Sequence, residues 1–177
     1  MRDASARTVR RIGRMLALGA MLALCPLAPA AAQEHDYAAT IHEALSEFEG
    51  GHFEESLALF RLAHSLRPSA RTLRGLGNAS FELRHYVDAV TYYRDALAST
   101  ENPLTAEQRT EVEHLAARAR VFVGAYHLAV TPAGASVAIG GTAAAGSDVL
   151  LEIGEHTLSV TASGFETRTT TITVRGG

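Results

Sequence analysis

The sequence predicts an α+β protein with two parts, helical hairpins followed by a small antiparallel β-sandwich. Three observations predict this fold class. Apolar residues recur at helical spacing as far as Val123, one pattern within that stretch occurs twice, and the spacing then changes to a period of two. A fixed repeat with helical spacing inside each copy indicates stacked helical hairpins. Alternating apolar residues between Gly and Pro indicate short antiparallel strands with one wet face.

Residues 1–32 have the plan of a secretory signal peptide. Five arginines and a single acidic residue, Asp3, come first, an uncharged apolar run begins at Met15, and three alanines end at Ala32. Basic, apolar and small-residue segments in this order direct export and are removed afterwards. We therefore expect cleavage after Ala32 and an exported protein of the periplasm or cell envelope.

Two alternatives for this leader stay open. The apolar run is just long enough for an uncleaved membrane anchor, although Pro26 and Pro29 disfavour a continuous helix. The run also resembles the lipobox of bacterial lipoproteins, in which a cysteine is acylated, and Cys25 is the only cysteine of the chain. Leu24 stands where that motif has Gly, Ala or Ser. Cleaved export is the interpretation that the leader favours.

The charge of the chain excludes one class of partner. The whole chain has 16 basic residues, all of them Arg, and 19 acidic ones. The leader holds five of the basic and one of the acidic residues, so the mature chain has 11 and 18, a net charge of −7. An acidic body repels phosphate backbones, so we expect no nucleic-acid partner.

The helical part, expected over 33–123, contains the repeat. Small and large apolar types keep their places between the two copies, and each matched pair is 33 positions apart, as Ser56 and Ala89 are. The small residues let the helices of a hairpin approach each other, and Phe60 and Tyr93 fill the space between them. The matched pairs are Ala44 and Gly77, Phe48 and Phe81, Phe53 and Tyr86, Ser56 and Ala89, Leu57 and Val90, Phe60 and Tyr93, and Ala63 and Ala96.

Glycine and proline divide this part into five expected helices. Gly51 follows the first helix, and Pro68 closes the second. Thr105 and Gln108 form a capping box that opens the last helix. Two repeats leave an apolar side open, so we expect this last helix to cap them. The expected helices are one that includes 41–48, then 53–66, 69–83, 86–99 and a capping helix over 105–123.

The repeat resembles the tetratricopeptide repeat, with two copies at about 37–69 and 70–103. The second copy meets the family signature, and the first has Ser56 where Ala is usual. The resemblance implies a concave groove that holds peptides and is lined by the first helix of each repeat. The signature residues of the second copy are Gly77, Phe81, Tyr86, Ala89, Tyr93 and Ala96, and the implied groove residues are Ile41, Leu45, Phe48, Arg74, Asn78 and Phe81.

Arg74 and Asn78 lie one helical turn apart and could hold the carboxylate of a chain terminus, because Arg donates two parallel hydrogen bonds to such a group. The alternative is that both are helix-surface residues without a ligand. Four arginines that are close in sequence favour an acidic peptide as the occupant. They are Arg61, Arg67, Arg71 and Arg74.

The strand part, 124–177, resembles the PEGA domain. The stretch from Pro132 to Ala135 matches the Pro-Glu-Gly-Ala motif with Ala in place of Glu, and His156 and Phe165 follow glycines as in the later family elements. The resemblance implies attachment or interaction in the cell envelope rather than catalysis. So small a sheet is marginal alone, and we expect it to lean on the capping helix or a partner. The five expected strands cover about 126–130, 137–139, 149–153, 158–160 and 167–175.

We expect no enzyme, no cofactor and no bound metal. None of the eight histidines has another three or four residues away, which is the spacing of a helical metal site. No phosphate-binding glycine loop or nucleophile elbow is present in the sequence. The function that the sequence favours is an exported envelope adaptor that binds a protein or peptide. The alternative is a carbohydrate- or cell-wall-binding protein in which the strand part binds and the helices are a spacer.

Overall fold

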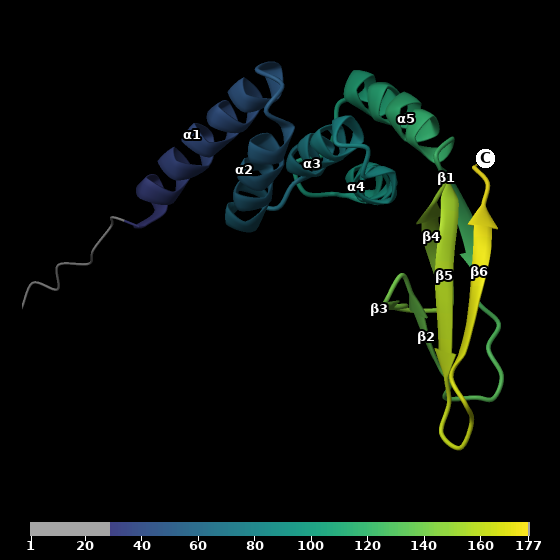
Figure 1. Cartoon of the computed structure of the whole chain (residues 1–177). Helices are drawn as coiled ribbons and strands as arrows, with labels where there is room; N and C mark the ends of the chain where they lie inside the picture. The colour runs from purple at the N-terminus through teal and green to yellow at the C-terminus, as the bar shows by residue number, and fades with distance from the viewer. Residues whose placement is uncertain (1–28, 177) are drawn as a thin grey trace, which may run out of the picture.

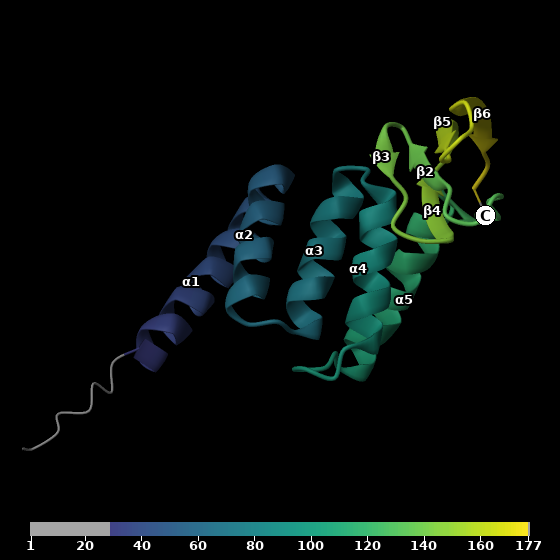
Figure 2. The same cartoon turned by 90° about the horizontal axis from the view of Figure 1, so that it is seen from below.

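The computed structural model describes residues 29–176. Five helices come first, and six strands follow (Figure 1). Each helix packs against the next one in the chain, so the helices form a row of antiparallel hairpins (Figure 2). The helices are α1 (Pro29–Glu49), α2 (Phe53–Leu66), α3 (Ala70–Glu82), α4 (Tyr86–Ala98) and α5 (Ala106–Arg120).

The predicted signal peptide lies outside the described residues except for 29–32, which belong to α1. Cleavage after Ala32, lipidation of Cys25 and an uncleaved anchor therefore stay predictions. Among the described residues, none of the helices has the length and apolar character that a membrane span requires.

The turn between α1 and α2 and the turn between α3 and α4 have the same backbone geometry, so the repeat includes the turns. The N–H of His52 donates to the carbonyl of Glu47, and the N–H of His85, 33 residues later, donates to that of Ser80, both at 2.9 Å. Gly51 has a φ of 80° and Arg84, at the same place in the second copy, has a φ of 61°. Glycine adopts this left-handed conformation without steric cost, whereas an L side chain rarely does. The two hairpins therefore share one turn geometry despite different residues.

The small residues of the repeat lie where aromatic rings need room. A Cβ atom on Gly77 would come within 2.5 Å of the Tyr93 ring. Gly75 has the same relation to Phe60, whose ring lies against the backbone of α3. Ser56 is fully buried, and its hydroxyl donates a hydrogen bond of 2.8 Å to the carbonyl of Ala44. The contacts of Gly77 and Ser56 confirm the expected packing within each hairpin, whereas Phe60 packs between the two hairpins.

The capping box of α5 is confirmed, since Gln108 N–H donates to the Thr105 hydroxyl and Thr105 N–H donates to the Gln108 side chain, both at 3.2 Å. The expected end of this helix is wrong. α5 ends at Arg120 rather than near 123. The carbonyl of Phe122 accepts a hydrogen bond from the N–H of Ile153, the residue after strand β4 (Asp148–Glu152). Pairing with this strand segment therefore replaces the last helical turn.

The strands form two antiparallel sheets, one with the order β1-β4 and one with the order β3-β2-β5-β6. Pairing brings Val137 of β2 opposite Val160 of β5, and His156 of β5 opposite Ile172 of β6. The fold class is thus the predicted α+β arrangement. The strands are β1 (Val123–His127), β2 (Ser136–Ile139), β3 (Thr142–Ala143), β4 (Asp148–Glu152), β5 (Gly154–Thr161) and β6 (Arg168–Val174).

Two strand predictions are wrong. β3 was not expected, because it has only two residues and no apolar alternation. The first strand was expected over 126–130, but β1 ends at His127. The N–H of Leu128 then donates to the carbonyl of Ser147 outside the strand ladder, and Leu128 and Val130 line a groove instead. Alternating apolar residues alone therefore do not distinguish a paired β-strand from an extended, unpaired segment that lines a groove.

The two-stranded sheet of β1 and β4 packs against α4 as well as against the capping helix α5, on which the strands were expected to lean. One apolar cluster contains buried residues of α4 and α5 together with Val123 of β1, and Leu150 of β4 packs against it. The ring of Phe122 stacks on that of Tyr86 with centroids 4.2 Å apart. The N–H of Tyr86 donates to a carboxylate oxygen of Glu152 on β4 at 2.9 Å. These contacts join the two parts at the start of α4.

Candidate functional site

A groove of about 610 Å³ lies along α1 and α3. Its apolar wall is formed by Tyr37, Ile41, Leu45 and Phe48, which are one helical turn apart on α1. The amphipathic spacing of α1 turns this stripe inward, while the intervening residues Glu43 and Ser46 are exposed. Leu45 remains 48% exposed, so the wall has apolar surface that a ligand could cover.

The opposite wall is basic and comes from the start of α3. Ser69 caps this helix through a reciprocal pair with Thr72, which was not predicted. The helix therefore begins at Ala70 and carries Arg71, Arg74 and Asn78 toward the groove. Arg67 precedes the cap and also lines the groove, as do Asn102 from the loop before α5 and Gln108 from α5 itself.

Five of the six residues predicted for the groove line it together. They are Ile41, Leu45, Phe48, Arg74 and Asn78. That they bind a ligand stays a prediction.

Phe81, the sixth predicted residue, does not line the groove. Its ring lies edge-on to Tyr86 at 5.6 Å, and the Arg118 guanidinium lies 4.9 Å from its centroid. The helix α5 covers Phe81 in the second repeat, whereas Phe48, its match in the first repeat, lines the open groove. Phe81 is therefore a packing residue of the second hairpin.

The sequence did not single out Tyr37, Gln108 or Asn102. The run of arginines did indicate Arg67 and Arg71, which both line the groove. Tyr37 precedes the apolar pattern by one turn, and it lies 5.5 Å from the Arg67 guanidinium, a cation–π distance. Only the fold brings Gln108 from α5 to the same site.

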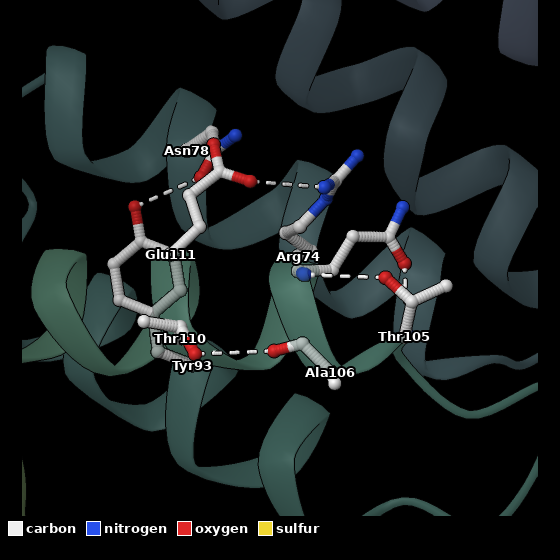
Figure 3. A network of polar contacts seen from close by, with 8 residues as sticks. Arg74, Asn78, Tyr93, Thr105, Ala106, Thr110 and Glu111 are labelled. Atoms are coloured by element: carbon white, nitrogen blue, oxygen red, sulfur yellow. Dashed lines mark hydrogen bonds and ion pairs between the residues drawn. The ribbon is translucent and has the colours of Figure 1, made fainter.

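Arg74 forms one ion pair in the groove (Figure 3). Its Nη1 lies 3.2 Å from Oε2 of Glu111 on α5, and no second contact joins the two groups. The Arg74 side chain is 28% exposed and the Glu111 side chain is 54% exposed. A half-exposed pair with a single contact contributes little to stability, about 0–1 kcal/mol.

Asn78 is oriented by Tyr93. The buried phenol donates a hydrogen bond of 3.0 Å to Oδ1 of Asn78 (Figure 3). Burial raises the pKa of Tyr93 far above its usual value, and the nearby carboxylate of Glu82 raises it further, so the hydroxyl remains a donor. Because the oxygen of the Asn78 amide is used, its Nδ2 group is left as a donor at the groove.

Gln108 is held in the same way. Its Oε1 accepts the N–H of Thr105 in the capping box, which leaves Nε2 as the free end of the amide. Arg71 is exposed at the groove, and no carboxylate within the described part of the chain pairs with it. The polar side of the groove is thus rich in N–H donors from amides and guanidinium groups. Such a surface suits ligands rich in carboxylate and carbonyl oxygens.

A second groove, of about 570 Å³, lies in the strand half. Leu128, Val130, Leu158 and Val160 line it, and Phe165 stands at it with 67% of its surface exposed. Tyr126, the other aromatic residue of this half, is 36% exposed but does not line this groove. The two aromatic side chains therefore do not form one binding platform.

Over residues 29–176, no three His, Cys, Asp or Glu side chains lie close enough together to hold a metal ion. Nδ1 of His127 lies within hydrogen-bond distance of Oδ1 of Asp148, at 2.8 Å, and both side chains are exposed. This contact holds the ends of β1 and β4 together, since these two residues are register partners.

The strand half matches a known family model. Residues 124–177 match the PEGA domain, which confirms the resemblance that the motifs around Pro132 and Phe165 indicated. No curated protein matches the chain. The tetratricopeptide resemblance of the helices has no family match, although the paired helices are compatible with it, and it stays a prediction.

Proposed function

We propose that this protein is an exported, non-enzymatic adaptor of the cell envelope that binds acidic peptide segments of other proteins in the groove between α1 and α3. In this proposal the helices act as two tetratricopeptide-like repeats with a capping helix. The PEGA domain provides attachment or interaction at the envelope. The leader supports export, and the PEGA domain supports the envelope as the destination.

One observation carries the choice of an acidic peptide. On the polar wall, the oxygens of Asn78 and Gln108 accept hydrogen bonds within the protein, so the N–H groups of these amides remain as donors beside the arginines. Arg71 adds a positive charge that no carboxylate neutralises within the described residues. A carboxylate or a peptide carbonyl can accept hydrogen bonds from these donors. A basic segment would leave the donors unpaired, and its positive charges would be repelled by Arg71. The apolar wall on α1 suits aliphatic or aromatic side chains of the same segment.

Peptide binding tests this proposal. The probe is a short fluorescent peptide that alternates Asp and Leu, and its control replaces each Asp by Asn. The mature chain should bind the acidic peptide more tightly, and added salt should weaken that binding because the groove is open to solvent. An amidated form of the acidic peptide separates recognition of a chain terminus from recognition of side-chain carboxylates.

Arg71→Gln should weaken binding of the acidic peptide, whereas Arg120→Gln should not. Both arginines are exposed and lose the same charge, but Arg120 lies at the far end of α5 and does not line the groove. Equal affinity for the acidic and the Asn-containing peptide, or an equal effect of the two substitutions, would contradict the proposal.

A second candidate is binding of carbohydrate or cell-wall material by the strand half. The exposed ring of Phe165 beside an apolar groove supports it, because aromatic faces stack on sugar rings. In this case insoluble wall material should retain the protein, and Phe165→Ala should abolish retention while Arg71→Gln leaves it unchanged. Retention that both variants keep would exclude this candidate.

A further inference from the structure

Glu111 presents to Arg74 the same chemical group that an acidic partner would present. Its Oε2 lies 3.2 Å from Arg74 Nη1, and the two residues come from different helices, 37 positions apart in the chain. Figure 3 shows the Glu111 carboxylate joined to Arg74, which lies one helical turn before Asn78 on α3. This carboxylate therefore pairs with one of the donors that define the polar wall of the groove.

We infer that Glu111 is an internal competitor for the groove, a specificity-determining residue that holds Arg74 until a partner carboxylate displaces it. The inference rests on the proposed function, because it assumes that the groove takes an acidic segment. The inference adds that the acidic segment must displace the Glu111 carboxylate from Arg74.

The contact geometry favours displacement by the right partner. Glu111 approaches Arg74 through one oxygen and one nitrogen. A guanidinium group has five donors and pairs best with a carboxylate through two parallel hydrogen bonds. A partner carboxylate that makes this two-contact pair and also meets the Asn78 Nδ2 donor forms more bonds than it breaks. A neutral side chain gains no charge-assisted bond and leaves Glu111 in place.

The Glu111 side chain can move without a movement of α5. Val112, the neighbour of Glu111, is fully buried in the core with Ala116, so the backbone of α5 is anchored there. The Glu111 side chain is more than half exposed, and a change of rotamer would take its carboxylate into solvent. Displacement therefore costs one exposed ion pair and no rearrangement of the fold.

The opposite role for Glu111 would be to position Arg74 for the partner. Removing a positioning residue weakens binding, whereas removing a competitor tightens it. The two roles therefore predict changes of opposite sign in the dissociation constant.

The test compares Glu111→Gln with Glu113→Gln in the full mature chain. Neither residue lines the groove itself, but Glu111 pairs with Arg74, whereas Glu113 is exposed on the same helix, so the control has the same change of charge and residue type. The probe is the Asp-Leu peptide, and the Asn-Leu peptide reports unspecific effects. Glu111→Gln should bind the acidic peptide roughly two- to fivefold more tightly than Glu113→Gln does, as expected for loss of an exposed competing pair.

The outcomes separate the two claims. If the parent chain prefers the acidic peptide and Glu111→Gln binds no more tightly than Glu113→Gln, the competitor role is wrong and the proposed function stands. If the parent chain and both variants bind the acidic and neutral peptides equally, the proposed function fails and the inference fails with it.

Discussion

The backbone N–H of Tyr86 and the side chain of Glu152 are joined by a hydrogen bond of 2.9 Å, although 66 residues separate them in the chain. Tyr86 opens α4, where the first N–H groups have no partner within the helix. The residue before it, His85, supplies no side-chain cap. The carboxylate of β4 thus takes the place of a cap and brings a negative charge to the positive end of the helix. The strand half thus contacts the helical half through Glu152, which caps the N-terminus of α4.

Glu152→Ala should lower the free energy of unfolding by about 1–2 kcal/mol, because it removes a charge-assisted bond to an otherwise unpaired backbone group. Chemical denaturation of the whole chain measures the change. Glu155→Ala is the matched control, since Glu155 is exposed on the neighbouring strand. Equal effects of the two substitutions would show that the contact does not contribute to stability.

Gly77→Ala should destabilise the protein although alanine is the better helix former. The new methyl group would meet the Tyr93 ring at 2.5 Å, and such overpacking costs about 1–3 kcal/mol. The gain in helix propensity offsets about 1 kcal/mol of this. The net loss, about 0–2 kcal/mol, would appear as a lower thermal midpoint. At Gly146, which has open space around it, the same substitution should have little effect. A stabilised Gly77→Ala chain would contradict the close approach of α3 and α4.

Val112→Ala should destabilise the protein by about 1–3 kcal/mol, because the Val112 side chain is fully buried between α5 and α4 and its removal leaves a cavity. Val121→Ala deletes the same atoms at a position that is 60% exposed, so it should change little. Both are measured by denaturant unfolding. If the two variants unfold alike, α5 is not the cap of the repeats.

His64 should make stability depend on pH. Burial lowers the pKa of His64 below 6.5, and its Nδ1 lies 2.7 Å from the Thr72 hydroxyl. The unfolded chain therefore binds a proton at a higher pH than the folded chain does. The resulting stabilisation is fully present above about pH 6.5 and is lost as the pH falls through the lowered pKa of the folded state.

The thermal midpoint should thus fall less between pH 7 and pH 5 for His64→Gln than for the parent chain, roughly in line with the linkage relation. His114→Gln serves as the control, since His114 is exposed on α5. A fall that is identical in all three proteins would contradict the role of His64.

Much of the fold follows from local sequence. Gly51 marks a helix end because glycine readily adopts the left-handed conformation that stops a helix, and Pro68 does so because its ring cannot continue one. The helix between them, α2, has the expected bounds. The repeat could be recognised because matched positions meet the same packing demand, and the shared turn geometry of Gly51 and Arg84 shows how closely the copies agree. The period of two in the second half predicted antiparallel strands for the same local reason.

The features that the sequence did not reveal depend on contacts between distant residues. Phe81 has the pattern of a groove residue, but α5 covers it through Arg118. Glu111 looks like any exposed acid on a helix until the fold places it against Arg74. The end of α5 is set by pairing of Phe122 with Ile153, and no local pattern marks that change. Helical spacing therefore predicted which faces turn inward, and tertiary contacts decided which of them stay open.

The most direct test of the central claim is to map the binding surface in solution. Backbone amide NMR shifts of the mature chain are followed while the Asp-Leu peptide is added. The account predicts that the shifted resonances cluster on α1 and α3, around Leu45, Phe48, Arg71 and Asn78, with Arg71→Gln reducing all of them. Shifts that gather instead around Phe165 and Val160 in the strand half, or no shifts at peptide concentrations that saturate binding, would contradict it.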